Sequence, residues 1–164
     1  MNFSNKYHLK ISSIKIEYSK SILLNKMDLY DSCLNGNIHR LRELLNTDLT
    51  IDINEIICED TLLHLGAGQN HLEIVQELLN HHADINVIDN MGQTPLHVAS
   101  RCNSPLTAKE LIIRGADLNI QDNDGCTPLH CASFNGFEDI IQDLLAHGAN
   151  CNLQNKNGDR PLDI

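Results

Sequence analysis

The amino-acid sequence predicts an all-α fold built from repeated pairs of short helices, on three observations. The segment Thr94-Pro95-Leu96-His97 recurs 33 residues later as Thr127-Pro128-Leu129-His130. Two further motifs recur with the same step, and the apolar residues between them follow the helical period. Motifs that share one period indicate tandem structural units, each of which buries an apolar side against its neighbours.

The recurring motifs mark turns and helix ends. In Thr-Pro-Leu-His, the threonine is placed to cap a helix N-terminus, and proline suits the first helical position because its φ is already fixed. The Asp-x-x-Gly motif predicts a turn whose glycine adopts a positive φ. Gly115 and Gly148 follow apolar helical patterns and are expected in the left-handed conformation that ends a helix. The turn motif occupies 89–92 and 122–125, and 155–158 with asparagine first.

The first two units are predicted in chain order from their apolar stripes. In the degenerate first unit, residues 29–35 are expected to form one helix, and Leu41, Leu44 and Leu45 mark the second. In the second unit, Thr61 and His64 take the motif positions of a helix over 62–69. A further stripe over 72–79 has helical spacing and predicts the partner helix.

The third and fourth units follow the same plan. Thr94 and Thr127 begin their first helices, and Ser104-Pro105 is expected to cap and start the next helix of the third unit. The second helix of the fourth unit is predicted from one apolar stripe, which comprises Phe137, Ile140, Ile141, Leu144 and Leu145. Arg160-Pro161-Leu162-Asp163 aligns with the start of a fifth unit.

These residues resemble the ankyrin repeat family. The resemblance rests on the 33-residue period together with Thr-Pro-Leu-His, Gly-Ala-Asp-x-Asn and Asp-x-x-Gly in register, and it covers roughly residues 28–164. It implies an all-α solenoid of stacked helix-turn-helix units with projecting hairpin-like fingers, stabilised mainly by contacts between neighbouring units. The expected domain is 27–164, with units 27–55, 56–88, 89–121 and 122–154 and a partial unit 155–164.

Two departures from the family pattern stand out. Ile56, Glu59 and Leu62 occupy positions where the family usually has Asp, Gly and Pro, so a regular finger is not expected at 56–60. His82 replaces the usual glycine at a helix end, where a left-handed conformation costs a residue with a side chain about 1–2 kcal/mol.

Composition and charge narrow the function classes. The 164 residues carry a formal net charge of -10, and an acidic surface repels phosphate, so no nucleic-acid partner is expected. No apolar run is long enough to span a membrane. Residues 1–26 hold five lysines and one glutamate, and we expect a basic, flexible N-terminal extension there. A tail that binds acidic surfaces and an upstream translation artefact before Met27 are the alternatives.

The C-terminal end leaves three alternatives open. The sequence stops within the first helix of the fifth unit, whereas a solenoid needs a polar outer face on its last repeat. We therefore expect the chain to be a truncated product or a fragment of a larger repeat protein. The alternatives are an end covered by a partner and self-association through that end.

Metal and catalytic sites are not expected. His64, His97 and His130 occupy equivalent positions that lie about 10 Å apart when helices stack, whereas zinc ligands must lie about 2 Å from one ion. In the resembling family this histidine ties neighbouring units by hydrogen bonds. Cys126 and Cys131 lack further spaced ligands, and no phosphate-binding glycine loop is present. We expect no cofactor and no catalysis, with a metal-dependent enzyme as the remote alternative.

The family resemblance implies recognition of another protein through finger tips and the exposed face of each first helix. Met91 and Phe134 are the expected anchors, because large apolar groups dominate interface energies. Their alternative role is to cover neighbouring fingers. The six cysteines and the lack of an export signal favour an intracellular, cytoplasmic protein, with delivery into a host cell as an alternative. The full candidate set is Ile88, Asn90, Met91, Gln93, Arg101, Cys102, Gln121, Asn123, Asp124, Cys126, Phe134, Asn135, Gln154, Lys156, Asn157 and Asp159.

Overall fold

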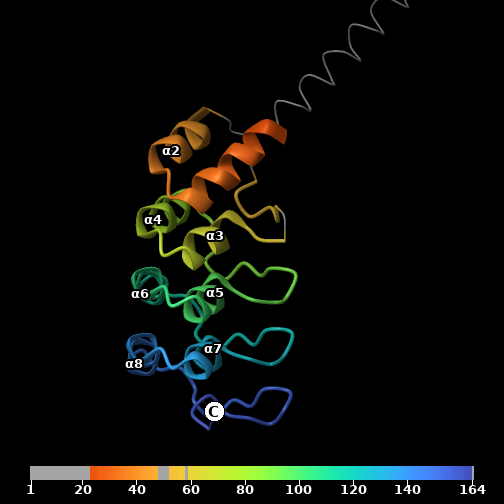
Figure 1. Ribbon diagram of the computed structural model, residues 1–164, viewed down its shortest axis with the longest axis vertical. Helices are drawn as coiled ribbons and strands as arrows, with labels where there is room; N and C mark the ends of the chain where they lie inside the picture. The colour runs from red at the N-terminus through yellow and green to blue at the C-terminus, as the bar shows by residue number, and fades with distance from the viewer. Residues whose placement is uncertain (1–22, 48–51, 58, 164) are drawn as a thin grey trace, which may run out of the picture.

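The computed structural model describes residues 23–47, 52–57 and 59–163, and within these ranges it shows helices joined by turns and loops. The chain forms a stack of helix pairs that runs along the long axis of the molecule (Figure 1). The all-α repeat fold is therefore confirmed. After a helical segment over 23–35, the helices are α2 (Ile38–Thr47), α3 (Leu62–Gly68), α4 (Leu72–Asn80), α5 (Pro95–Arg101), α6 (Pro105–Ile113), α7 (Pro128–Asn135) and α8 (Glu138–Ala146).

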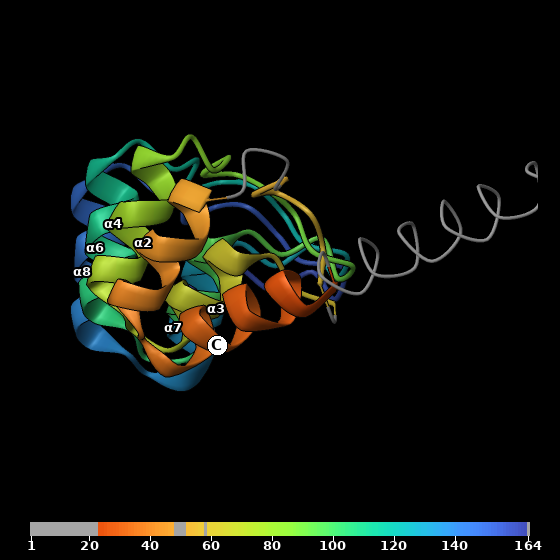
Figure 2. The ribbon, with the colours of Figure 1, turned by 90° about the horizontal axis from the view of Figure 1, so that it is seen from above.

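The helices form two columns. The inner helices α3, α5 and α7 pack on one another in order, and the outer helices α2, α4, α6 and α8 do the same. Seen from above, the inner helices lie between the outer helices and the projecting loops (Figure 2). We call three of these loops fingers: residues 89–93, 122–126 and 155–159. The buried core runs continuously through the stack and is aliphatic, with Leu63, Leu96 and Leu129 at equivalent buried positions.

The Thr-Pro-Leu-His motifs begin α5 and α7 as the sequence predicts. Thr94 Oγ1 accepts a hydrogen bond from the backbone N–H of His97, and the same bond joins Thr127 to His130. Nδ1 of each histidine accepts a hydrogen bond from the backbone N–H of its threonine, and this second bond completes a capping box. The start of α5 and of α7 is therefore fixed, which sets the register of each unit, whereas Thr61 before α3 makes no side-chain cap and contacts only the His64 ring.

Residues at helix ends adopt positive φ where the sequence predicts it. Gly115 and Gly148 have φ of 88° and 90°, and His82 has φ of 65° in the corresponding place. The expected strain at His82 is thus present in the structure. Glu59 also has positive φ, in a turn closed by reciprocal backbone hydrogen bonds between Ile57 and Asp60. This turn differs from the fingers, as its departure from the motif predicts.

The predicted side-chain cap at Ser104 is wrong. The Ser104 hydroxyl donates to the Gly68 carbonyl oxygen at 2.9 Å instead of accepting from its own helix. Asn70, which lies in the preceding unit, supplies the cap, because its Oδ1 accepts from the backbone N–H groups of Leu106 and Thr107. The N-terminus of α6 is therefore satisfied across the unit boundary, which couples α6 to the unit before it.

The apolar stripe of α8 divides between core and surface. Ile140 and Leu144 are fully buried, whereas Leu145 is 38% exposed. Successive residues lie about 100° apart around a helix, so Leu144 and Leu145 cannot both face the same neighbour. A core position for Leu145 at an interface between units is thus wrong, and Leu144 occupies it.

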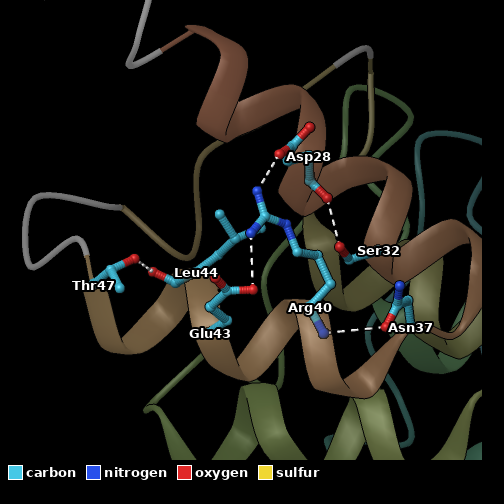
Figure 3. Close-up of polar contacts among 7 residues, drawn as sticks. All are labelled: Asp28, Ser32, Asn37, Arg40, Glu43, Leu44 and Thr47. Atoms are coloured by element: carbon cyan, nitrogen blue, oxygen red, sulfur yellow. Dashed lines mark hydrogen bonds and ion pairs between the residues drawn. The ribbon is translucent and has the colours of Figure 1, made fainter.

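The first unit is held by polar contacts around Arg40. Its guanidinium binds the carboxylate of Asp28, on the helical segment 23–35, and lies 2.9 Å from Glu43 on α2 (Figure 3). Asn37 Oδ1 accepts from the Arg40 backbone N–H at the start of α2. Arg40 therefore joins the two helices of the unit through one side chain.

The helical segment 23–35 includes the last residues of the expected N-terminal extension. Lys26 lies in this segment and forms an ion pair with Glu55 at 2.6 Å. Residues 1–22, which make up the rest of that extension, lie outside the described residues.

Candidate functional site

A cleft of about 390 Å³ lies beside α7, between the inner helix and the fingers 122–126 and 155–159. Its walls come from the C-terminal end of α5, from α7 and from three successive fingers. The stacking of units positions these walls, because the backbone N–H of Asn123 donates to the Met91 carbonyl and that of Lys156 donates to the Asp124 carbonyl. Neighbouring fingers are thus fixed to one another at their tips.

The cleft gathers more than half of the partner-binding candidates. They come from sequence positions as far apart as Gln93 and Asp159. Phe134 is the largest apolar group among them, and its side chain is 75% exposed. The candidates that line the cleft are Gln93, Arg101, Asp124, Cys126, Phe134, Asn135, Lys156, Asn157 and Asp159.

The remaining candidates lie outside the cleft. Met91 and Ile88 are each 54% exposed. Neither residue lines the cleft that contains Phe134. Gln121 bridges two fingers, because its Nε2 donates to the carbonyl oxygens of Gly125 and Gln154. The Asn123 side chain donates to the Asn90 carbonyl. Cys102 is exposed at the end of α5. Gln121, which directly precedes the finger 122–126, and Asn123, which lies on it, therefore both stabilise the fingers.

Gln93 is buried, at 5% exposure, contrary to its expected place on an exposed tip. Its backbone N–H donates to Asp89 Oδ1, and its carbonyl accepts from His64 Nε2 at 2.8 Å, so the residue is held beneath the finger. Its side-chain Oε1 has no hydrogen-bond partner among the described residues. A buried acceptor without a donor costs about 1–3 kcal/mol. Gln93 thus lines the cleft and carries a buried, unpaired acceptor, Oε1.

Sequence reasoning missed several lining residues. The repeat pattern identifies Asp122 and Asn155 only as turn residues, and it gives Cys131 no role beyond a rejected metal ligand, yet all three line the cleft. Asp122 Oδ1 accepts from the backbone N–H groups of Asp124 and Cys126, so its carboxylate also builds the finger. The equivalent position of Asp89 in the finger before it was the available signal. The repeated aspartate predicts that a turn forms, but it does not predict which side of that turn faces a cleft.

The thiols in the cleft are protonated at neutral pH. Burial raises the pKa of Cys131 to about 12, with a smaller contribution from the Asp122 carboxylate. Burial also raises the pKa of Cys126, and Asp122 and Asp124 add to the shift. A thiol is a weak nucleophile and a weak metal ligand unless it is deprotonated. The two cysteines therefore act as small, largely uncharged wall residues.

The histidines of the repeat motif are occupied by structural hydrogen bonds. His130 contacts the Thr127 hydroxyl through Nδ1 and the Asp159 carbonyl through Nε2. His64 and His97 make the equivalent bonds to the finger of the next unit. Over 23–47, 52–57 and 59–163, no three His, Cys, Asp or Glu residues gather as ligands for a metal ion.

Comparison with known proteins gives a family match over most of the chain. The family model of ankyrin repeats (3 copies) matches residues 29–122 and 103–164. The chain is 32% identical over 74 residues to the probable 26S proteasome regulatory subunit p28 of Saccharomyces cerevisiae. The matched segment covers 44% of this chain and 32% of that protein. Among the described residues, no helix is both long and apolar enough to traverse a bilayer.

Two further relatives match shorter shares of their own length. The ankyrin repeat protein FPV031 of Fowlpox virus is 41% identical over 64 residues, 38% of this chain and 19% of that protein. The probable E3 ubiquitin-protein ligase XBOS31 of Oryza sativa subsp. japonica is 31% identical over 77 residues, 46% of this chain and 17% of that protein. The matched segment thus spans about a third or less of each of these curated relatives.

Proposed function

Because the chain belongs to the ankyrin repeat family, which generally mediates protein–protein interaction, we propose that it is a non-catalytic scaffold that binds a partner protein. The partner contacts the fingers and the side of the inner helices that faces them. The yeast relative is named as a proteasome regulatory subunit, and this supports the proposal.

One observation carries the proposal. The cleft beside α7 brings an exposed phenylalanine, Phe134, together with polar and charged groups from three fingers. Its volume of about 390 Å³ suits a few side chains of a partner. An aromatic group beside a rim of polar groups is the usual composition of an interface hot spot. Because the fingers are already fixed to one another, binding orders little backbone and loses little conformational entropy.

A capture experiment with matched variants tests the proposal. The full chain is immobilised as wild type, as Met91→Ala with Phe134→Ala, and as Leu106→Ala with Ile113→Ala. Leu106 and Ile113 are 55% and 63% exposed on α6, so the third protein loses similar apolar surface from an outer helix. Proteins retained from cell extract are quantified by mass spectrometry.

The outcome separates the two faces of the stack. We expect a set of proteins that is retained by wild type and by the α6 variant and is lost from the Met91/Phe134 variant. Circular dichroism should show that all three chains keep the same helical signal. If the same proteins are retained by all three chains, the finger side is not the binding surface.

We also propose that the protein resides in a reducing intracellular compartment. The cysteines Cys33, Cys102, Cys126, Cys131 and Cys151 are free thiols, which is the usual state in such a compartment. Self-association of the chain stays a prediction, and sedimentation of the purified chain at several concentrations tests it.

A further inference from the structure

The Gln93 carboxamide is not explained by the stability of the fold. The backbone of Gln93 makes the contacts to Asp89 and His64 that hold the finger, and every residue except proline has the backbone atoms for both bonds. The equivalent positions in the neighbouring fingers are Cys126 and Asp159. An apolar side chain at position 93 would fill the same buried place without leaving Oε1 unpaired. The acceptor therefore points to a donor that arrives from outside the chain.

Charge indicates what kind of donor fits. The carboxylates of Asp122, Asp124 and Asp159 line the same cleft as Gln93. The positively charged lining residues are Arg101 and Lys156, and in the described part of the chain neither forms an ion pair. The carboxylates outnumber the cations, and the whole chain has a formal charge of -10. The wall thus favours a positively charged group and disfavours a carboxylate.

Phe134 adds a second preference. Phe134 lines the same cleft and is 75% exposed, so most of its surface is accessible to an incoming group. A guanidinium stacks on an aromatic face and donates in-plane hydrogen bonds at the same time, because it is flat and carries five N–H groups. A lysine ammonium is more strongly hydrated and lacks this flat geometry. An arginine side chain therefore satisfies the acceptor, the carboxylates and the ring together.

We propose that the cleft beside α7 receives an arginine side chain of the partner protein, with its guanidinium donating to Gln93 Oε1 and to the cleft carboxylates and lying against Phe134. This inference rests on the proposed scaffold function and specifies the chemistry that the scaffold recognises. Because Oε1 is itself buried, this contact requires the Gln93 carboxamide to turn about its last side-chain bond toward the entering group. Arg101 and Lys156 oppose binding by like charge, so their removal strengthens it.

A peptide array tests the chemistry directly. The probes are nine-residue peptides with randomised flanks and a fixed central residue, which is arginine, citrulline, lysine, leucine or glutamate. Citrulline is a suitable control because it keeps the size of arginine and loses its charge. We expect the wild-type chain to bind the arginine set about tenfold more strongly than the citrulline set, because charge-assisted hydrogen bonds are the stronger ones. Added salt should reduce the difference.

Variants then assign the binding to the cleft. Gln93→Leu should lose most of the preference for arginine over citrulline, and its unfolding midpoint should not fall, because no backbone contact is removed. Gln142→Leu is the matched control, since Gln142 is an exposed glutamine on α8, and it should keep the full preference. Lys156→Gln should bind the arginine set more strongly than wild type.

Two results would overturn the inference. One is equal binding of the arginine and citrulline sets, or no binding of any set. The other is an arginine preference that Gln93→Leu leaves intact. Both leave the scaffold proposal standing, because the capture experiment with the Met91/Phe134 variant tests it independently.

Discussion

The Nε2 atom of His97 lies 3.0 Å from the backbone carbonyl oxygen of Cys126, which belongs to the next unit. The other ring nitrogen, Nδ1, lies 2.8 Å from Thr94 Oγ1 at the start of the same helix. One buried ring thus fixes a helix N-terminus and ties it to the following finger. His64 and His130 repeat the arrangement, so this bond links successive units through the stack.

Replacing His97 with leucine should destabilise the stack. The variant removes the ring bond to the Cys126 carbonyl, which keeps only the Asp122 N–H, and leaves the Thr94 backbone N–H without its acceptor. We expect a loss of about 1–3 kcal/mol in the free energy of unfolding. Urea unfolding followed by circular dichroism measures it. His39→Leu, at an exposed position on α2, is the control and should change stability little. Equal midpoints for both variants would contradict the structural role of His97.

Acidification should destabilise the protein through its buried histidines. Burial lowers the pKa of His64 and of His97 below the ordinary value of 6.5, although nearby carbonyl oxygens and carboxylates partly offset the shift. Unfolded histidines bind protons first as the pH falls, so the free energy of unfolding decreases between pH 7.5 and 5.5. Each group contributes at most about 1.4 kcal/mol per pH unit.

The pH dependence is measured by urea unfolding at several pH values in that range. His97→Leu should show a shallower dependence than wild type, because one of the two groups is gone. A wild-type protein whose stability is constant or rises toward pH 5.5 would show that these histidines are not held neutral by burial.

The two leucines of α8 should respond differently to a charge. Leu144 is fully buried and Leu145 is 38% exposed. Leu144→Asp places an unpaired carboxylate in the core and should cost more than about 3 kcal/mol. Leu145→Asp can keep its charge in water and should cost less than about 1 kcal/mol. Thermal unfolding of both variants tests which side of α8 faces the core. Similar losses of stability for the two variants would contradict the burial of Leu144 alone.

Gly92 should be sensitive to an added methyl group because it meets the next finger. Gly92 has φ of 73°, and a Cβ there would lie 2.7 Å from Asn123 Oδ1 and 3.1 Å from the Asn123 backbone nitrogen. Gly115 has φ of 88°, and its Cβ would meet nothing within 4 Å. Both alanine variants pay the cost of a positive φ, about 1 kcal/mol.

The comparison of the two glycines isolates the contact between fingers. Gly92→Ala should lose more stability than Gly115→Ala, because only the first must also shift Asn123 and the backbone bond that Asn123 donates to Met91. Urea unfolding measures both losses. Equal losses would mean that the fingers move apart at little cost.

The sequence gives a good account of the fold and a partial account of the cleft. The helix starts at Pro95 and Pro128 follow from local preferences. The positive φ of His82 follows from its place in the repeat, against the local preference of a residue with a side chain. The exposed Phe134 could be identified because its position lies outside the repeated motif. Gln93 could not be placed correctly by the same reasoning. It lies next to Thr94 in the chain, but its burial depends on the unit that packs beneath it.

The Ser104 cap shows the same limit. Ser104-Pro105 is a local signal for a helix start, and the helix does start there. The acceptor that caps it is Asn70 of the preceding unit, which takes up the bond because the stacking brings its side chain to that helix. A local pattern thus predicts where a helix begins, while the neighbouring unit decides which atom satisfies it.

The sequence by itself determined the repeat period, the helix pairs and the caps of α5 and α7, because these depend on interactions between residues only a few positions apart. The tertiary structure alone decided which side chains share the cleft, which of Leu144 and Leu145 is buried, and that Gln93 Oε1 lacks a donor. These features depend on the distance and rotation between successive units. Those quantities follow from how the buried side chains of neighbouring helices pack, and no single unit contains them.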